Sequence, residues 1–400
     1  MPSRPAADGA HPIEVEAAGQ HPLGMPPAVF LRDYWQKRPL LVRNAFPEYR
    51  SPIEPEDLAG LACEDGVLAR IVQHDRQRDA WTVETGPFPE SRFPGLPGHD
   101  WTLLVQDVDK WDPDVAALLE HFRFLPRWRL DDIMVSFAAP GGSVGAHVDQ
   151  YDVFLLQAQG HRRWQVDAGP NPPTGFRDDV ELRLLREFSP THDWVLAPGD
   201  MLYLPPGVPH HGVAEDACLT FSVGMRAPSA AELLGDYADH LLATADEAVR
   251  YSDPDLAVPD DPARIDASAL DRVGRALEAL RAEPDALAEW FGRFITTYRS
   301  AVEVAPAPGL PPPDQVEQAL AAGVPLQRHP WSRLAWHGDG EDATLFANGE
   351  AWPVPAADAR LLANAHEFDL DAFEALSPAG RQCLHQLVQS GHFLLPIDED

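Results

Sequence analysis

Nine short segments between residues 68 and 225 constrain the fold of this chain more than any other feature. Each is apolar or alternates between apolar and polar residues, and turn signals such as PGG, PGD and PPG separate them. The segments are 68–73, 80–85, 101–108, 131–139, 151–158, 161–167, 193–200, 200–205 and 219–225. Many short strands joined by tight turns predict an antiparallel sandwich or barrel. A short helix over 28–36 and a strand over 40–43 are expected before them.

The pattern becomes helical after Met225. Ser229 and Glu232 have the spacing of a capping box, which predicts that a helix begins there and runs to about Tyr251. Further helices are expected over 267–282 and 285–298. The apolar stripes of three such helices must be covered, either by the barrel or by a second copy of the chain. We expect a homodimer formed through this region.

The last hundred residues predict a small acidic domain of a winged-helix type. A Pro-rich stretch leads into helices expected over 315–322, 358–365 and 378–390, with a hairpin over 343–354. From Ala305 to the end there are four arginines, no lysine and fourteen acidic residues, which is a net charge near -10. A DNA-reading face needs the opposite sign, so we expect no DNA binding.

The charge of the whole chain limits the classes of partner that it can bind. Its formal net charge is -32, which suits either solubility alone or attraction to a basic protein and disfavours an anionic membrane. Cys63, Cys218 and Cys383 lie far apart, so no disulfide framework is indicated. The N-terminus lacks the pattern of a secretory leader, and no window has the apolar length of a membrane span. We therefore expect a cytoplasmic protein without a membrane partner.

The chemistry of the chain is concentrated in GAHVDQY. If this stretch is a strand, His147, Asp149 and Tyr151 point to one face. The same His-x-Asp spacing recurs at 337–339, so the pair alone is a weak signal. His210 follows a Pro-Pro-Gly turn and could complete the two-His, one-carboxylate triad of non-heme iron oxygenases. His211 is the rival ligand, but adjacent residues on an extended segment point oppositely, and we prefer His210.

The residues 141–160 and 199–210 resemble the two cupin motifs, and 131–166 resembles the bacterial ribosomal oxygenases of the JmjC class. The resemblance covers nearly the whole chain. It implies a mainly β double-stranded beta-helix followed by a helical dimerisation region and a C-terminal winged helix. It also implies an arginyl hydroxylase that uses Fe(II), 2-oxoglutarate and O2. The domains are then a disordered tail (1–24), the catalytic domain (25–226), the dimerisation region (227–302), a linker (303–315) and the winged helix (316–400).

The resemblance assigns a cosubstrate anchor as well. Arg162, the second residue after Gly160, stands where related proteins carry the cation that binds the far carboxylate of 2-oxoglutarate. A strand places Arg162 on the face of Trp164, whereas Arg163 faces away. The chain departs from its relatives at Ala138, where they tend to have a hydroxyl residue that assists the same carboxylate.

The substrate pocket is expected at Asp132, Met134, Tyr151 and Ser222. A carboxylate and a phenol beside an apolar side chain suit a guanidinium, although Asp132 could instead pair with Arg129. The resemblance points to an arginine of ribosomal protein sixteen of the large subunit, hydroxylated at its β-carbon. The alternatives are a histidine of another ribosomal protein and a cupin that binds a different metal without oxygenase activity.

Overall fold

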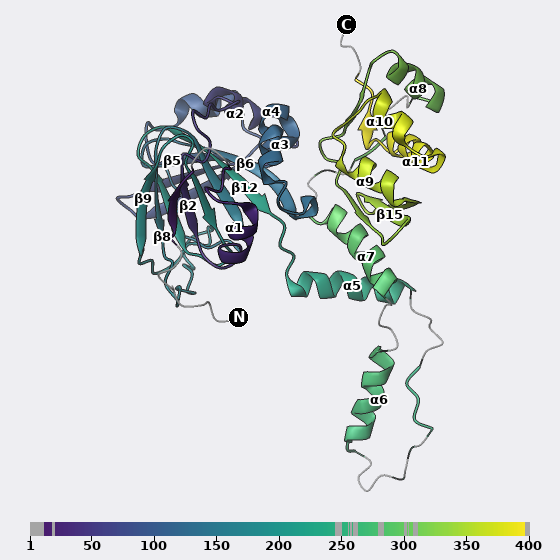
Figure 1. Cartoon of the computed structure of the whole chain (residues 1–400). Coiled ribbons are helices and arrows are strands. Elements are labelled where there is room, and N and C mark those ends of the chain that lie inside the picture. The colour runs from purple at the N-terminus through teal and green to yellow at the C-terminus, as the bar shows by residue number, and fades with distance from the viewer. Residues whose placement is uncertain are drawn as a thin grey trace. The chain divides into compact units, whose positions relative to one another are not determined.

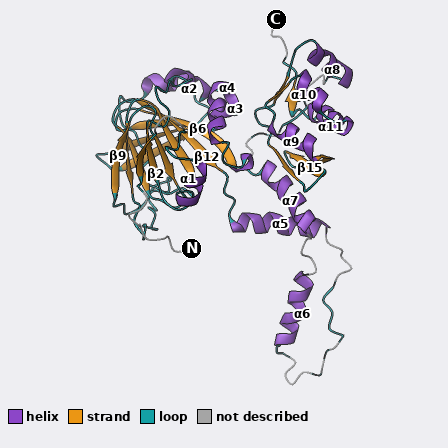
Figure 2. Cartoon of the chain, in the orientation of Figure 1, coloured by secondary structure: helices purple, strands orange, loops and turns teal. Residues whose placement is uncertain are grey.

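The computed structural model describes residues 12–17, 21–244, 250–254, 256, 258, 263–278, 284–299, 302, 304–306 and 311–396. The chain divides into two compact units, Met1–Ala227 and Pro228–Asp400. The first contains most of the strands, and the second combines helices with small sheets (Figures 1 and 2). Parts of the expected tail, of the expected linker and of two expected helix ends lie outside the described residues.

The first unit is built from two sheets. The larger has nine strands in the order β1-β2-β10-β7-β12-β6-β5-β3-β4, and the smaller has the order β11-β8-β9. Each of the nine predicted segments overlaps a strand, and β11 is an additional one. The strands are β1 (Glu14–Glu16), β2 (Leu40–Arg43), β3 (Ala69–Asp75), β4 (Ala80–Thr85), β5 (Trp101–Val105), β6 (Leu130–Ala138), β7 (Val153–Gln159), β8 (Arg162–Val166), β9 (His192–Leu196), β10 (Met201–Leu204), β11 (His210–Ala214) and β12 (Cys218–Met225).

The two faces of the larger sheet have different roles because side chains alternate along its strands. On one face, Phe154, Leu156 and Phe221 belong to a large core that also includes Phe30 and Leu58 from the covering helices. On the other face, residues such as Leu155 and Leu202 pack against Trp164 and Trp194 of the smaller sheet. The covering helices are α1 (Pro27–Asp33), α2 (Pro55–Leu61), α3 (Val108–Trp111) and α4 (Pro113–Ala117), with 3-10 turns at Glu90–Gly95, Leu118–Phe122 and Arg127–Arg129.

Strand β1 corrects the prediction of a disordered tail over residues 1–24. It pairs in parallel with β2, with Glu14 opposite Leu41. The Glu14 carboxylate accepts hydrogen bonds from Arg43 Nε at 2.7 Å and from Trp194 Nε1 at 3.1 Å. These partners lie far along the chain, so the composition of the N-terminal segment alone could not reveal them. Residues 1–11 and 18–20 lie outside the described part of the chain.

Three helices open the second unit: α5 (Ala230–Thr244), α6 (Ala267–Glu278) and α7 (Pro284–Thr297). The predicted capping box is confirmed, since Glu232 N donates to Ser229 Oγ at 3.1 Å and Ser229 N donates to Glu232 Oε2 at 2.8 Å. Residues 250 and 251 are not helical, so the prediction that this helix reaches Tyr251 is wrong.

The rest of the second unit contains two three-stranded sheets with helices. Its helix α7 was expected in the dimerisation region, yet it contacts the β14–β15–β16 sheet. Arg293 donates to the Gly349 carbonyl at 2.9 Å, and Gly349 N donates to Thr296 Oγ1 at 2.9 Å. The elements are α8 (Pro313–Ala321), β13 (Leu326–Arg328), β14 (Leu334–His337), β15 (Asp342–Ala347), β16 (Glu350–Pro355), α9 (Ala356–Asn364), β17 (Glu367–Phe368), α10 (Leu370–Ala375), α11 (Pro378–Gln389) and β18 (Phe393–Leu394).

Candidate metal centre

His147 and Asp149 lie on an irregular segment that precedes β7, and not on a strand as predicted. Gly141 and Gly145 have φ values of +78° and +79°, a region that L side chains rarely adopt, and these turns interrupt regular pairing. A Cβ at Gly145 would also lie 2.6 Å from Leu184. The segment is therefore held in a bent path that sequence periodicity does not predict.

A single β-bridge holds the two halves of the site together. His147 N donates to the His210 carbonyl at 3.0 Å, and His210 N donates to the His147 carbonyl at 3.0 Å. His210 is the first residue of β11, after the Pro-Pro-Gly turn. That turn is anchored on the other ligand segment, because Gly207 N donates to the Asp149 carbonyl at 2.7 Å. Residues far apart in the sequence are thus brought within reach of one ion.

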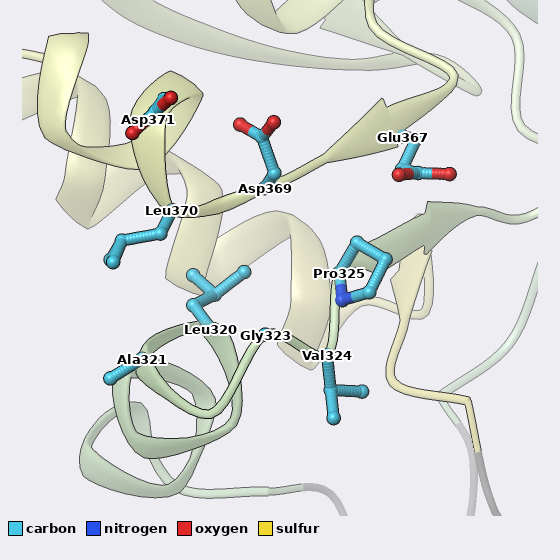
Figure 3. A pocket seen from close by; sticks show the side chains of 9 residues that line it. All are labelled: Leu320, Ala321, Gly323, Val324, Pro325, Glu367, Asp369, Leu370 and Asp371. Carbon is cyan, nitrogen blue, oxygen red and sulfur yellow. The ribbon is translucent and has the colours of Figure 1, made fainter.

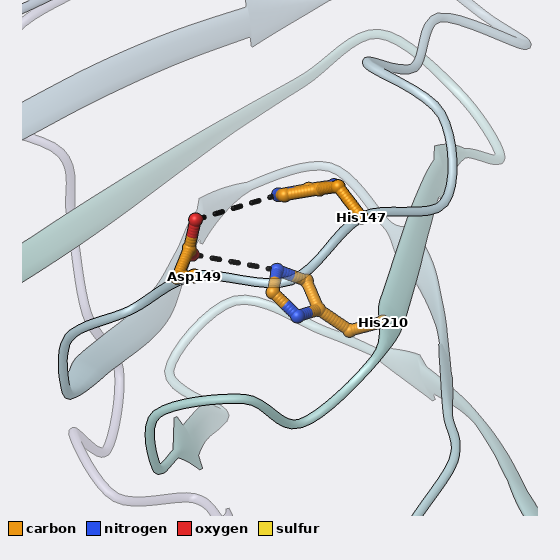
Figure 4. A group of neighbouring side chains, drawn as sticks. All are labelled: His147, Asp149 and His210. Atoms are coloured by element: carbon orange, nitrogen blue, oxygen red, sulfur yellow. Dashed lines mark ion pairs between the residues drawn. The ribbon is translucent and has the colours of Figure 1, made fainter. Parts of the chain in front are cut away.

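The three side chains converge on one point (Figure 4). His147 Nε2 lies 3.9 Å from Asp149 Oδ1, and His210 Nε2 lies 3.6 Å from Asp149 Oδ2. One nitrogen or oxygen from each residue lies within 4.8 Å of the others. The structure therefore brings together the three predicted residues as a site able to hold a metal ion. Two imidazoles and one carboxylate suit Fe(II) and leave coordination positions open.

Backbone contacts orient both imidazoles. His147 Nδ1 lies 2.9 Å from the Gly145 carbonyl, and His210 Nδ1 lies 2.9 Å from the Val208 carbonyl. A carbonyl only accepts, so each Nδ1 carries the proton and each Nε2 keeps its lone pair for a metal. Burial, together with the nearby His147, lowers the pKa of His210 to about 4. His210 is therefore neutral at physiological pH, as a ligand must be.

His211 does not join this group. The neighbouring His210 is buried, whereas His211 is half-buried and its ring lies 6.2 Å, edge to face, from Phe188. Burial lowers its pKa to about 4 as well, so the pKa does not distinguish the two histidines. Their directions do, because successive residues of β11 face opposite sides. The geometry supports the preference for His210.

Arg162 is a buried cation without an acidic partner among the described residues. Its side chain points from β8 into the protein interior, on the same face as Trp164, and the guanidinium lies 5.0 Å from the centre of that ring. Its Nε has no hydrogen-bond partner, and Nη1 reaches Ser136 Oγ at 3.4 Å. Burial lowers the pKa of this guanidinium. A buried charge needs a counter-ion, so this arrangement suits an anionic ligand.

Arg163 behaves as the opposite face predicts. It is partly exposed and pairs with Glu215 at 2.6 Å and Asp193 at 2.9 Å. Gly212, which the sequence pattern did not single out, makes room for the inward pair of Arg162 and Trp164. A Cβ there would lie 2.7 Å from Trp164 and 2.8 Å from Arg162 Nε. Its position in HHGVA, two residues after His210, could have indicated a close approach.

The predicted substrate residues lie on β6, on β12 and on the segment that carries Asp149. Met134 and Ser222 are directly opposite each other on β6 and β12. Tyr151 is 38% exposed, and the carboxylate of Asp149, followed by burial, raises its pKa. Asp132 accepts a hydrogen bond from Asp107 N at 3.2 Å. Burial and the carboxylates of Asp107 and other neighbours raise the pKa of Asp132 to about 7.

The alternative pairing of Asp132 with Arg129 is wrong. Arg129 lies 3.3 Å from Asp152, and no salt bridge to Asp132 is found among the described residues. Arg226 pairs instead with the neighbouring Asp131 at 3.2 Å. Asp132 is therefore a half-buried carboxyl group whose cationic partner is not supplied by these residues.

A second hollow lies in the other unit (Figure 3). This pocket of about 300 Å³ is formed between α8 and the β17–α10 segment, and Leu320 and Leu370 lie side by side within it. Its charged lining residues are Glu367, Asp369 and Asp371. Phosphate is repelled by such an acidic rim.

Comparison with known proteins gives the family. A JmjC domain matches residues 117–233, and a ROXA-like winged helix matches residues 279–393. The ribosomal protein uL16 3-hydroxylase of Escherichia coli K12 is 38% identical over 377 residues, which span 91% of this chain and 96% of that protein. The chain is a ribosomal oxygenase of the JmjC class. A probable ribosomal oxygenase of Haemophilus influenzae is 46% identical over 209 residues, about half of each chain.

Solved structures extend the similarity to the whole architecture. The X-ray structure of E. coli YcfD has a TM-score of 0.85 at 37% identity and covers 94% of this chain and 99% of that one. YcfD, a ribosomal oxygenase, has also been solved in complex with cobalt and 2-oxoglutarate, with a TM-score of 0.82 at 35% identity. The predicted family, the JmjC barrel and the winged helix are confirmed.

The winged-helix match also explains the placement of α7. The match begins at residue 279, before this helix, whereas the predicted domain begins at 316. The Pro-rich stretch that was predicted as a domain boundary in this ribosomal oxygenase therefore lies inside the matched winged-helix region. None of the described helices is long and apolar enough to cross a membrane.

Proposed function

We propose that this ribosomal oxygenase uses Fe(II) and 2-oxoglutarate to hydroxylate an arginine of ribosomal protein uL16. The observation that carries the proposal is the His147–Asp149–His210 triad together with Arg162, which is buried and has no acidic partner among the described residues. One group fits a metal with open positions, and the other fits the far carboxylate of a dicarboxylate ligand. The structure of YcfD with cobalt and 2-oxoglutarate supports this combination.

The chain positions its ligands and excludes water. When bound, Fe(II) and 2-oxoglutarate supply the oxidation, in which O2 is consumed, succinate and CO2 are formed and one oxygen atom enters the substrate. His147 and His210 hold the metal through Nε2 because their Nδ1 protons are directed to backbone carbonyls. Arg162, which points inward from β8, binds the far carboxylate and so sets the direction in which the cosubstrate extends from the metal. Trp164, which lies beside the guanidinium, belongs to an apolar cluster with Val166 and Leu155.

The pocket beside the metal favours a guanidinium. Asp132 supplies a carboxylate that no cation of the described residues pairs with, Tyr151 supplies a phenol, and Met134 supplies an apolar surface. In its ionised form Asp132 would orient the end of the arginine so that the β-carbon, several bonds back, faces the metal. The relative's name, a 3-hydroxylase of uL16, supports hydroxylation at this carbon. The net charge of -32 would speed encounter with so basic a protein.

The decisive test uses peptides that differ at one residue. The protein is incubated with Fe(II), 2-oxoglutarate and a uL16 peptide with the target Arg or with Lys in its place, and mass spectrometry measures the gain of one oxygen. We expect the Arg peptide to react and the Lys peptide to fail, since Lys lacks the planar donor fork. Equal oxidation of both peptides, or reaction of only a His-containing peptide, would refute the arginyl assignment and leave the oxygenase assignment standing.

A further inference from the structure

The side chain of Thr102 carries a buried hydroxyl group. It lies on β5, is completely buried, and its Oγ1 has no hydrogen-bond partner among the described residues. Buried polar groups in native proteins are nearly always paired, so an unpaired one requires an explanation. Its neighbours Leu103 and Val105 point into the large core on the covered face of the sheet. Thr102 therefore points to the opposite face, which is the face of the metal site.

The position of Thr102 on that face is set by strand register. Thr102 is directly opposite Ala138 on β6, and Ala138 is directly opposite Cys218 on β12. Side chains at directly opposite positions lie on the same face with Cβ atoms roughly 5 Å apart. Ala138 and Cys218 form a small buried cluster with Ala214, and Ala214 is opposite Arg162 on β8. Thr102 is thus one strand away, across the sheet, from the cluster of Ala138, Cys218 and Ala214 that includes the residue opposite Arg162.

Ala138 is the place where this chain lacks the expected hydroxyl. A carboxylate has about four lone-pair sites, and one arginine satisfies at most two of them. Ser136 Oγ lies 3.4 Å from Arg162 Nη1 and also from the Thr220 carbonyl, so both contacts of this hydroxyl are long. The hydroxyl of Thr102 and the Nε of Arg162 both lack a hydrogen-bond partner among the described residues. Arg162 reaches across from β8 to Ser136 on β6, the strand that pairs with β5.

We infer that Thr102 donates a hydrogen bond to the far carboxylate of 2-oxoglutarate and replaces the hydroxyl missing at position 138. The inference rests on the proposed function. In this arrangement Arg162 supplies the charge and Thr102 supplies a third hydrogen bond from the facing strand.

The test measures binding in the absence of turnover. The full-length protein is loaded with Mn(II), and calorimetry gives the dissociation constants of 2-oxoglutarate and of 2-oxopentanoate, which has a methyl group in place of the far carboxylate. Thr102→Val keeps the shape and removes the hydroxyl, so it should weaken 2-oxoglutarate binding roughly tenfold. Binding of 2-oxopentanoate should not change. Thr102→Ser should bind 2-oxoglutarate as the parent protein does.

Two further variants make the test specific. Ala138→Ser added to Thr102→Val should restore the affinity, because it places a hydroxyl on the neighbouring strand. Thr102→Val should also melt at the same or a higher temperature without ligand, since it removes an unsatisfied hydroxyl. Unchanged 2-oxoglutarate affinity in Thr102→Val, or equal weakening of both ligands, would overturn the inference. If the parent protein itself fails to bind 2-oxoglutarate, the proposed function fails instead.

Discussion

The two imidazoles at the metal site are set by single backbone carbonyls. Each Nδ1 is committed to a carbonyl 2.9 Å away, and each Nε2 faces Asp149. His211, one residue further on, has a similar pKa but points elsewhere. Loss of a direct ligand should cost more than the ~10–100-fold typical of outer-shell changes in metal sites.

We therefore expect His210→Ala to weaken Co(II) binding more than ~100-fold, whereas His211→Ala should bind within a few-fold of the parent protein. Metal titration followed by absorbance measures both constants. The assignment would be refuted if His211→Ala lost the metal and His210→Ala retained it.

We expect Asp132 to give the proposed reaction a pH dependence. Its pKa is raised to about 7, so in the free protein this carboxyl becomes protonated as the pH falls through that value. A guanidinium is attracted by the ionised form, so kcat/KM for an Arg peptide should rise with pH and level off above about 7. Asp132→Asn should lower the plateau and remove this rise.

The raised pKa of Asp132 has the opposite effect on stability: activity should rise with pH, whereas the contribution of this group to the free energy of unfolding should fall. A carboxyl group whose pKa is raised by folding favours the protonated form, so its contribution is present below the unfolded value of ~4 and lost as the pH rises toward 7. Asp132→Asn should thus gain stability relative to the parent between pH 4 and 7. A pH profile identical in variant and parent would show that another group titrates.

At the level of elements, α7 is the clearest case in which packing overrides sequence grouping. Gly292 lies where α7 meets β15, and a Cβ there would lie 2.4 Å from the ring of Phe346. Gly274 on α6 offers a matched control, because a Cβ at that position would have no described atom within 4 Å. Both glycines are inside helices and neither has a positive φ.

Gly292→Ala should destabilise the winged-helix unit by ~1–3 kcal/mol through overpacking. Gly274→Ala should instead stabilise its helix by ~0.5–1 kcal/mol, since Gly is the poorer helix former. Thermal denaturation of the two full-length variants measures the difference. If Gly292→Ala melts at as high a temperature as Gly274→Ala, then α7 does not pack on the β14–β15–β16 sheet as described.

At the scale of the whole molecule, the homodimer stays a prediction. Because α7 packs on the β14–β15–β16 sheet of its own unit, we expect a partner copy to contact α5 and α6. Large side chains there are more than half exposed: Leu234, Leu242, Leu270 and Leu277. Leucines at this exposure on two helices are expected to be covered by another surface.

We expect Leu270→Asp combined with Leu277→Asp to convert a dimer into a monomer in sedimentation velocity, because a charge cannot be buried in an apolar interface without a partner. Gly274→Ala on the same helix is the control and should leave the sedimentation coefficient unchanged. A parent protein that sediments as a monomer at micromolar concentration would remove the prediction.

Much of this protein is determined locally and could be read from the chain. Alternation along β8 predicted which of Arg162 and Arg163 points inward, because the two-residue period of a strand is a local property. The capping box at Ser229 and Glu232 formed as predicted for the same reason, since its partners are three residues apart. The residue types of the triad likewise indicated a metal before any coordinates.

Tertiary structure decided what depends on partners distant in sequence. The bridge between His147 and His210 bends the first ligand segment out of the predicted strand. Pairing with β2 turns residues 14–16 into a strand, and packing against Phe346 moves α7 into the winged helix. Arg129 has Asp152 as its partner, and no salt bridge to Asp132 is found in the described part of the chain. Such contacts join segments that no local period relates, so their free energy is settled only when the whole chain has folded.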